Sequence, residues 1–329
     1  MSLKRLINSF GPLAKMKNKI LRVMTPNLRR LLYLYRRQGW QELVNDIRAD
    51  SFSSKVNWTE SSSHLIFVSG LPKSGTTWIE QLLGCTPGMV QLNRSVLRVF
   101  PHSAVNAEEA NITPEMLSCA PANKLSYIKL HSTPEPAHFA LLEEFNIKVV
   151  VLIRDLRDQA ISSMQHGITV RSHPLYSSLV DCPEDKRLLA SMSFRSPLTG
   201  LPLSEYYANW VIGWIEYANN NPEMAMIVKY ENMVNDILYE LKRIFDFCGY
   251  EYTNNTLDNI LSLYSKRHCS DRMNSLKDNL SKVGRLTSTF RKGIPREWQQ
   301  IYSKEELDYA KTYFCEALIA SGYEMNSNW

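Results

Sequence analysis

The feature that most constrains the fold is the segment spanning residues 64–78, in which an apolar run leads through a glycine-rich turn into the start of a helix. Residues 65–68 are short, apolar and partly β-branched, which is typical of a buried strand, and from Thr76 onward the apolar residues have helical spacing. A strand, loop and helix in this order direct several backbone N–H groups and the positive end of a helix dipole toward one point. The segment therefore predicts an anion-binding loop.

The two glycines of this loop, Gly70 and Gly75, have the spacing of the G-x-x-x-x-G-K-S/T loop that binds nucleoside triphosphates. Thr76 stands where that motif has its lysine, and Lys73 lies within the loop instead. The phosphate cradle is thus retained, while the geometry at a metal and a γ-phosphate is changed. Two alternatives stay open: a glycine-rich turn without a ligand, and a magnesium-dependent nucleotide kinase in which residues 152–155 hold the metal.

The run Pro-Lys-Ser-Gly-Thr-Thr-Trp at residues 72–78 resembles the 5′-phosphosulfate loop of the sulfotransferase family. Members of that family use 3′-phosphoadenosine 5′-phosphosulfate (PAPS) as the sulfuryl donor. The resemblance implies donor binding, without a metal, by Lys73, Ser74, Gly75, Thr76, Thr77 and Trp78. It also implies that Lys73 is catalytic, because it neutralises the leaving phosphate, and that Trp78 stacks near the adenine.

The rest of the chain alternates apolar strands with helical segments, which predicts an α/β fold: a single domain with a central parallel sheet flanked by helices and a P-loop-like PAPS loop. A chain of 329 residues with 44% hydrophobic residues can form one such domain. The further predicted strands are residues 125–130, 148–153 and 224–229. Helices are predicted at Thr113, at residues 136–145 and 204–220, and after a capping box at residues 303–306. The aromatic residues of 204–220 are interpreted as core.

The first 60 residues form a separate basic extension and linker, and residues 61–329 form the sulfotransferase domain in this interpretation. Ten lysines and arginines precede the first acidic residue, Glu42, and Thr25, Pro26 and Gly39 mark the limits of an amphipathic helix. Such a helix can lie on an anionic membrane, or it can pack on the catalytic domain or a neighbouring chain. Both alternatives stay open.

Composition narrows the class of protein and its location. The net charge of +5 is modest, so no nucleic-acid partner is expected. The six cysteines lack Cys-x-x-Cys spacing and are interpreted as free thiols in a reducing compartment. No run has the roughly 20 apolar residues of a membrane span, and the first residues lack the apolar core of a secretory signal. We therefore expect a cytoplasmic protein, with peripheral membrane contact through the basic helix as an open alternative.

A second motif lies at residues 149–163, where another buried strand leads directly into a helix. Ligands of open α/β sheets bind beyond the carboxyl ends of the strands, so Arg154 is expected near the phosphate loop. The segment resembles the family's 3′-phosphate motif, which implies that Arg154 and Ser162 bind that phosphate. The alternative is an ordinary helix start, in which Asp155 is the cap and Arg154 or Arg157 pairs with Asp158.

A third motif, residues 290–298, resembles the C-terminal Arg-Lys-Gly-x-x-Gly-Asp-Trp segment of the family. The resemblance implies that Arg291, Lys292 and Gly293 also bind the 3′-phosphate. Arg296 and Glu297 replace the Gly-Asp pair, so a different path of this loop is expected. The residues that follow do not match the family's dimer motif, and the oligomeric state stays open.

Two weaker correspondences concern the adenine. Tyr230 follows a predicted strand and matches a family tyrosine beside the base. The segment around Ser270 aligns with an adenine-contacting Thr-Ser-Phe stretch, which implies that Ser270 binds the donor, although Asp271 stands in place of the aromatic residue.

The remaining requirement is a base near the acceptor. The strand end at residues 127–134 resembles the family's Lys-x-His segment, which implies that His131 deprotonates the acceptor and that Lys129 steadies charge on the transferred group. A histidine at a strand end can equally be structural, and the four competing histidines are His102, His138, His166 and His173, none of which follows a lysine at this spacing. The acceptor is expected to be a small-molecule or lipid-like hydroxyl or amine. A nucleotide-binding adaptor without catalytic activity is the third alternative function.

Overall fold

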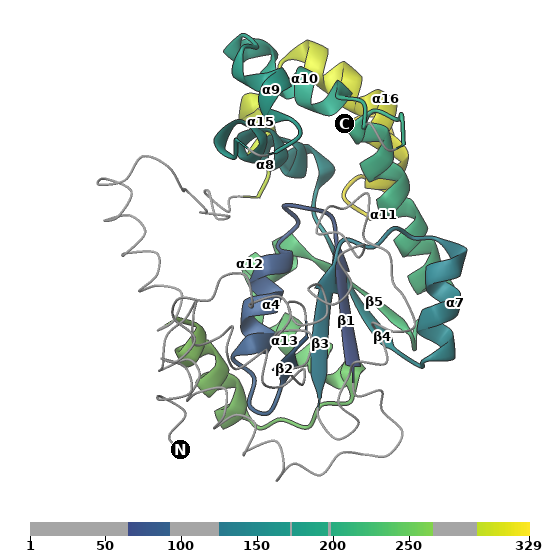
Figure 1. The fold of residues 1–329 in the computed structure, drawn as a ribbon, viewed down its shortest axis with the longest axis vertical. Coiled ribbons are helices and arrows are strands. Elements are labelled where there is room, and N and C mark those ends of the chain that lie inside the picture. Colours follow the sequence, from purple (N-terminus) through teal and green to yellow (C-terminus); the bar gives the residue numbers. More distant parts are fainter. Residues whose placement is uncertain (1–64, 93–124, 172, 197–198, 266–294) are drawn as a thin grey trace, which may run out of the picture. The chain divides into compact units, whose positions relative to one another are not determined.

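Five parallel strands form the centre of the computed structural model, which describes residues 65–92, 125–171, 173–196, 199–265 and 295–329 (Figure 1). They lie in the order β2-β3-β1-β4-β5. Their bounds are Leu65–Gly70 (β1), Val90–Gln91 (β2), Ser126–Leu130 (β3), Lys148–Ile153 (β4) and Ala225–Lys229 (β5). The four strands predicted from apolar runs are confirmed, and β2 is an addition.

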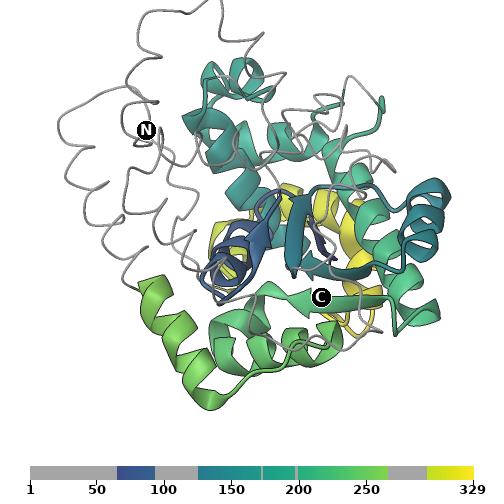
Figure 2. The same ribbon diagram turned by 60° about the horizontal axis from the view of Figure 1, so that its bottom comes forward.

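Helices lie on both sides of this sheet, as the alternating pattern predicts (Figures 1 and 2). Those on the side of the phosphate loop are α4 (Thr76–Gly84), α12 (Tyr230–Asn235) and α13 (Ile237–Cys248). On the opposite side lie α7 (Pro136–Glu144) and α11 (Leu203–Asn220), and α16 (Lys304–Ala320) packs against α11. Four helices lie beyond the carboxyl ends of the strands, namely α8 (Leu156–Thr169), α9 (Tyr176–Val180), α10 (Arg187–Ser193) and α15 (Trp298–Ile301) (Figure 1). The predicted α/β class is therefore confirmed, whereas the helix predicted at Thr113 and the basic extension lie outside the described residues.

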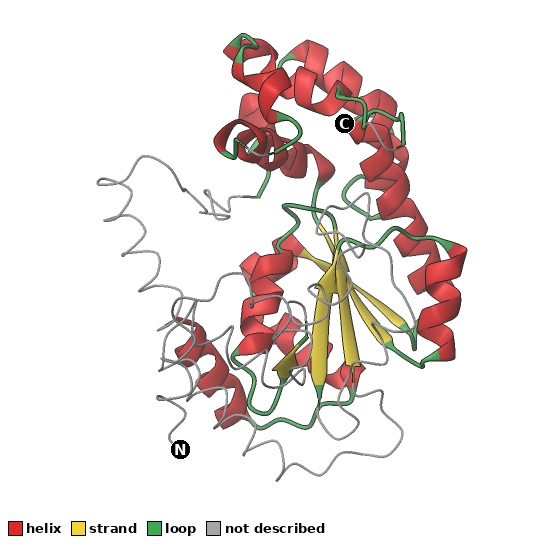
Figure 3. Cartoon of the chain, in the orientation of Figure 1, coloured by secondary structure: helices red, strands yellow, loops and turns green. Residues whose placement is uncertain are grey.

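Helices lie on both faces of the sheet (Figure 3). Successive residues of β1, β3, β4 and β5 enter different cores, so both faces are buried. Phe67 and Val151 pack with Trp210 and Trp214 of α11 in one core, while Val68 and its neighbours pack against α4 and α13 in the other. Trp210 and Trp214 are almost fully buried, which confirms that the aromatic residues of α11 belong to the core. Strands buried on both faces explain the nearly continuous apolar runs of the sequence.

The capping box predicted for the last helix is present at α16. The Ser303 hydroxyl accepts a hydrogen bond from the backbone N–H of Glu306 at 3.3 Å, and the Glu306 carboxylate accepts one from the N–H of Ser303 at 2.7 Å. Among the residues that the structure describes, no helix is long and apolar enough to cross a membrane.

The strand register places the candidate site residues in one row at the carboxyl edge of the sheet. Ser69 lies beside Leu130, so the next residues, Gly70 and His131, are neighbours. In the same way, Ile153 lies beside Lys229, which brings the following residues, Arg154 and Tyr230, together. The connection after β1 runs to β2 on one side of the sheet, whereas the connection after the neighbouring strand β4 runs to β5 on the other side. Open α/β sheets bind ligands at such a change of direction.

Candidate active site

The loop between β1 and α4 has a backbone that only a glycine-rich sequence adopts easily. Lys73 and Gly75 have φ angles of 72° and 94°, both in the left-handed region. The N–H and the hydroxyl of Ser74 both donate to the carbonyl of Leu71, at 3.2 and 2.6 Å, which closes the turn. A Cβ atom at Gly75 would lie 2.7 Å from the ring of Tyr230, so no larger residue fits there.

The carbonyl groups of the loop are held by side chains that come from the β4–α8 segment. Gln159 donates to the carbonyl of Pro72 at 2.8 Å, and Arg154 donates to that of Lys73 at 3.2 Å. Because the peptide bonds are trans, the N–H of Lys73 points away from the carbonyl that Gln159 holds. No described side chain caps the N-terminus of α4, so its first amides remain available to an anion.

Two cationic side chains lie together at this loop. Burial, and next the positive charge of Arg154, lower the pKa of Lys73 to about 8. Arg154 is only 7% exposed, and its buried Nε atom has no hydrogen-bond partner among the described residues. No ion pair between described residues includes Arg154. The anionic groups of PAPS, its phosphosulfate beside Lys73 and its 3′-phosphate beside Arg154, would supply the missing charge and acceptors, so the residues present fit this donor.

The aromatic residues predicted for the adenine lie on the same side of the loop. The rings of Trp78 and Tyr230 meet edge to face, with centroids 6.1 Å apart. The guanidinium carbon of Arg154 lies 4.6 Å from the centroid of the buried Tyr230 ring. Ser162, the other predicted 3′-phosphate ligand, is buried on α8. The structure thus brings Trp78, Arg154 and Tyr230 together beside the loop.

His131 lies against the first residue of the loop. Its Nδ1 atom is 2.5 Å from the carbonyl oxygen of Gly70, which can only accept a hydrogen bond. Nδ1 therefore carries the proton, and Nε2 has a free lone pair. Burial, and next the charge of Lys129, lower the pKa of His131 to about 4, although the bond to Gly70 opposes this shift. The imidazole is therefore neutral near pH 7 and can accept a proton.

The strand end that carries His131 is fixed by the tryptophans of α11. The carbonyl of Ser132 accepts hydrogen bonds from the indole N–H groups of Trp210, at 2.8 Å, and Trp214, at 3.0 Å. By contrast, Nδ1 of the buried His138 lies 2.9 Å from the carbonyl of Thr133, as expected for a structural histidine. These contacts hold the backbone beside His131 in one position.

Lys129, the second predicted residue of this strand, forms an ion pair that the sequence does not indicate. Its Nζ atom lies 3.1 Å from the carboxylate of Glu80 on α4, and the other oxygen of Glu80 accepts a hydrogen bond from Gln91. Glu80 offsets the charge of Lys129 on the α4 side of the sheet. The position of Glu80 in its helix gives no sequence signal of this ion pair.

His166 and His173 lie within electrostatic reach of the loop. Their rings meet edge to face at 5.3 Å. Burial, and next the positive charge of Lys73, lower the pKa of both histidines, that of His166 to about 4. Neither histidine follows a lysine at the Lys-x-His spacing of His131, although both lie in the electrostatic field of Lys73.

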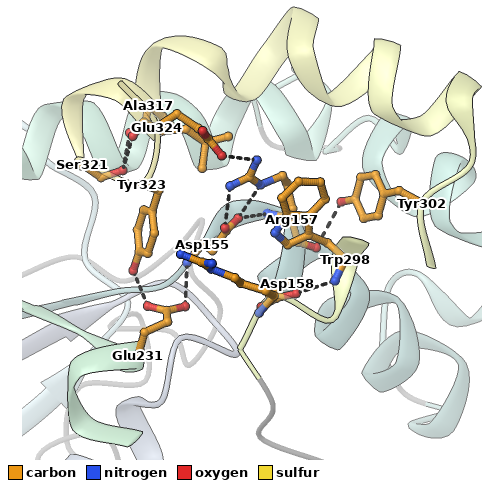
Figure 4. Close-up of polar contacts among 12 residues, drawn as sticks. Asp155, Arg157, Asp158, Glu231, Trp298, Tyr302, Ala317, Ser321, Tyr323 and Glu324 are labelled. Carbon is orange, nitrogen blue, oxygen red and sulfur yellow. Dashed lines mark hydrogen bonds and ion pairs between the residues drawn. The ribbon is translucent and has the colours of Figure 1, made fainter. Parts of the chain in front are cut away.

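The start of α8 differs from the alternative interpretation in one respect. Asp155 caps the helix as that alternative expected, because its carboxylate accepts the N–H of Arg157 at 3.0 Å. Arg157 pairs with Asp155 at 2.7 Å and Glu324 at 2.6 Å, and not with Asp158 (Figure 4). Arg157 is therefore neutralised by two carboxylates, whereas Arg154 is not.

Asp158 binds backbone groups of a distant turn instead of an arginine side chain. Its carboxylate accepts the N–H groups of Arg296, at 2.6 Å, and Trp298, at 2.9 Å. Arg296 has a φ angle of 63°, a left-handed conformation that glycine adopts without strain, and the family pattern has glycine at this position. Arg296 thus adopts a conformation that the glycine of the pattern would adopt without strain.

Four predicted donor ligands, Ser270, Arg291, Lys292 and Gly293, lie outside the described residues. Within those that are described, no group of three or more acidic, histidine or cysteine side chains could hold a metal. The cysteines there, Cys85, Cys182, Cys248 and Cys315, are free thiols.

Comparison with known proteins agrees with this geometry. The family model for the sulfotransferase domain matches residues 63–322. Among curated proteins, the flavonol 4′-sulfotransferase of Flaveria chlorifolia is 22% identical, covering 95% of this chain and 97% of the relative. Cytosolic sulfotransferase 3 of Arabidopsis thaliana is 25% identical, over 77% of this chain and 80% of the relative.

Two solved structures share the fold at low sequence identity. Mouse sulfotransferase SULT7A1 complexed with PAP has a TM-score of 0.54 at 16% identity, covering 82% of this chain and 89% of that one. Retinol dehydratase in complex with androsterone and inactive cofactor PAP has a TM-score of 0.51 at 16% identity, covering 83% and 84%. With its family model matched over most of its length, the chain belongs to the sulfotransferase domain family, and it is an enzyme of the PAPS-dependent kind that its loop predicts.

Proposed function

We propose that this enzyme transfers the sulfuryl group of PAPS to a hydroxyl or an amine of a small-molecule or lipid-like acceptor, with His131 as the general base. The observation that carries the proposal is the contact between His131 and Gly70. This contact supports the proposal, because a neutral imidazole with a lone pair on Nε2 beside a phosphate loop that contains Lys73 could accept the proton of an acceptor. The relatives named flavonol and cytosolic sulfotransferases support a small acceptor and a cytoplasmic location.

The donor supplies an activated sulfuryl group, and the chain positions and neutralises it. Lys73, Ser74, Gly75, Thr76 and Thr77 bind the phosphosulfate with backbone and side-chain donors, in the charge field of Lys73 and Arg154. On the nucleotide side, the proposed contacts are those of Trp78 and Tyr230 with the adenine, together with Ser270, and those of Arg154, Ser162, Arg291, Lys292 and Gly293 with the 3′-phosphate.

In the proposed reaction, the acceptor transfers its proton to His131. As the acceptor oxygen forms its bond to sulfur, the bond from sulfur to the 5′-phosphate oxygen breaks, Nε2 accepts the proton, and the bisphosphate carries away the electron pair. Lys73 neutralises the negative charge that develops on that phosphate. In our proposal, Lys129 steadies the charge of the transferred group from the Glu80 side of the site. A bound anion would also raise the basicity of His131 toward neutral pH.

Transfer of labelled sulfate tests this function. We expect incorporation from labelled PAPS into at least one class among phenols, alcohols, glycolipids and amines, with no change when a chelator is added. Phosphate transfer from ATP that a chelator abolishes would support the kinase alternative instead. Tight binding of 3′-phosphoadenosine 5′-phosphate without transfer to any acceptor would support the adaptor alternative.

The division at residue 60 gives a second prediction. Removing residues 1–50 is expected to leave the affinity for 3′-phosphoadenosine 5′-phosphate unchanged, because every donor motif lies beyond that point. Calorimetric titration of both proteins measures this directly. A folded truncated protein that has lost its affinity would refute the proposed boundary.

The same pair of proteins tests the basic extension. If the extension contacts membranes, the full chain should sediment with anionic vesicles and the truncated protein should not. Equal sedimentation of both would contradict a membrane role and leave packing on protein as its function.

A further inference from the structure

Glu231 links the start of α12 to the turn that follows β4. One oxygen of its carboxylate accepts the backbone N–H of Asp155 at 3.1 Å, and the other accepts the hydroxyl of Tyr323 at 2.5 Å (Figure 4). Its neighbour Tyr230 contacts the guanidinium of Arg154, the residue just before Asp155. A single carboxylate therefore holds the backbone on both sides of the contact between Arg154 and Tyr230.

The segment that follows α16, residues 321–329, provides the other half of this arrangement. Glu324 pairs with Arg157 at 2.6 Å, and Arg157 forms two further hydrogen bonds to the carboxylate of Asp155, at 2.9 and 2.7 Å. The guanidinium carbon of Arg157 lies 3.8 Å from the ring centroid of Trp298 and 4.5 Å from that of Trp329. Tyr323 and Glu324 thus reach Asp155 by two separate routes, one to its backbone and one to its side chain.

These contacts restrain the backbone next to Arg154. Arg154 is buried, and the positive charge of Lys73 lies close to it, so the two cations repel each other in the free protein. Holding Asp155 at both its N–H and its carboxylate removes most of the backbone freedom of that turn. Preorganisation of this kind strengthens binding because the ordering entropy is lost before the ligand arrives.

We propose that the segment after α16 is a positioning element of the donor site, in which Tyr323 and Glu324 hold the Arg154–Asp155 turn so that Arg154 faces the 3′-phosphate of the donor. The inference rests on the proposed function, because it assumes that Arg154 binds that phosphate. It assigns to residues 323 and 324 a role in distinguishing a 3′-phosphorylated nucleotide from one without that group.

The test compares two nucleotides in the full chain. Tyr323→Phe removes one hydroxyl, and Glu324→Gln removes the charge of the second contact. Each is expected to weaken binding of 3′-phosphoadenosine 5′-phosphate about three- to tenfold, the usual effect of one lost hydrogen bond. Adenosine 5′-phosphate, which lacks the 3′ group, should change by less than about twofold.

A matched control separates positioning from stability. Tyr309 on α16 also makes a hydrogen bond through its hydroxyl, to Ser204 at 3.3 Å. Tyr309→Phe should lower the melting temperature by a similar amount but leave the ratio of the two nucleotide affinities unchanged. An unchanged ratio in both Tyr323→Phe and Glu324→Gln would overturn the inference.

The variant Arg154→Ala tells this failure from a failure of the proposed function. It should weaken binding of 3′-phosphoadenosine 5′-phosphate by about 10- to 150-fold and leave binding of adenosine 5′-phosphate nearly unchanged. If Arg154→Ala lowers the ratio and the Tyr323 and Glu324 variants do not, only the positioning role is wrong. If Arg154→Ala leaves the ratio unchanged, the assignment of Arg154 to the 3′-phosphate is wrong, and the inference falls with it.

Discussion

The variant His131→Ala is expected to lower the rate of sulfuryl transfer by about 10²- to 10⁴-fold, the usual contribution of a positioned general base. The affinity for 3′-phosphoadenosine 5′-phosphate should stay within a few-fold, because the hydrogen bond of His131 to the loop goes to the carbonyl of Gly70 and not to the amides that face the donor. Single-turnover transfer, measured beside nucleotide binding, separates the two effects. A stable variant with near-normal turnover would show that another group, such as His166, takes the proton.

Loss of a partly buried histidine can also lower activity through stability, so the control follows the pH dependence of unfolding. The pKa of His131 is about 4 in the folded chain and about 6.5 when unperturbed. The unfolded chain therefore binds this proton first as the pH falls, and stability is lost between about pH 6.5 and 4. In His131→Gln this part of the acid destabilisation should disappear. If the acid dependence is unchanged, the buried environment assigned to His131 is wrong.

The variant Lys73→Met is expected to affect both donor binding and rate, with a loss of about 10²- to 10³-fold in turnover, the usual effect of removing one group that stabilises developing charge. It should also raise the melting temperature of the free protein, since a cation that is partly buried beside Arg154 is removed. The pKa of about 8 gives the sign with pH: nucleotide affinity of the native protein should fall as the pH rises above 8 and Lys73 loses its charge.

Lys148 provides the matched control for this prediction. Lys148 is the first residue of β4, so it lies at the opposite end of that strand from Arg154. Its ammonium group donates a hydrogen bond to the carbonyl of Phe247 at 2.5 Å. Lys148→Met should lower the melting temperature and leave nucleotide affinity unchanged. A Lys73→Met protein that is destabilised like Lys148→Met, with normal turnover, would contradict the role of Lys73.

Much of the fold was predictable because its signals are local. Residues 65–68 and 148–153 are apolar runs long enough to indicate strands, and a capping box marks the start of α16 within four residues. The strand β2 has only two residues, Val90 and Gln91, and two residues carry no periodicity. It is recognised only by its pairing with β3, where Val90 lies beside Ser126 and Gln91 beside Tyr127.

The site residues that lie in local motifs were likewise predictable, and the contacts between distant segments were not. The phosphate loop, Arg154 and His131 each lie in a short motif at a strand end, and the register of a parallel sheet then brings them together. The contacts of Arg157 could not be predicted in this way. Its partners Trp298 and Glu324 come from the other end of the sequence, while Asp158, the nearby carboxylate that sequence spacing suggests, is taken by distant backbone amides. Pair rules within one helix do not include such competitors.

The placement of the site at four strand ends has a consequence for how the enzyme is made. Gly70 and His131 are separated by 61 residues of chain, and Lys73 and Arg154 by 81. Contacts this far apart form slowly, since long loops must close before the strands pair. The ability to recognise the nucleotide therefore appears only at the end of folding, when β3, β1 and β4 lie side by side. A nascent or partly unfolded chain cannot bind it, and cellular donor should stabilise only molecules that have completed the sheet.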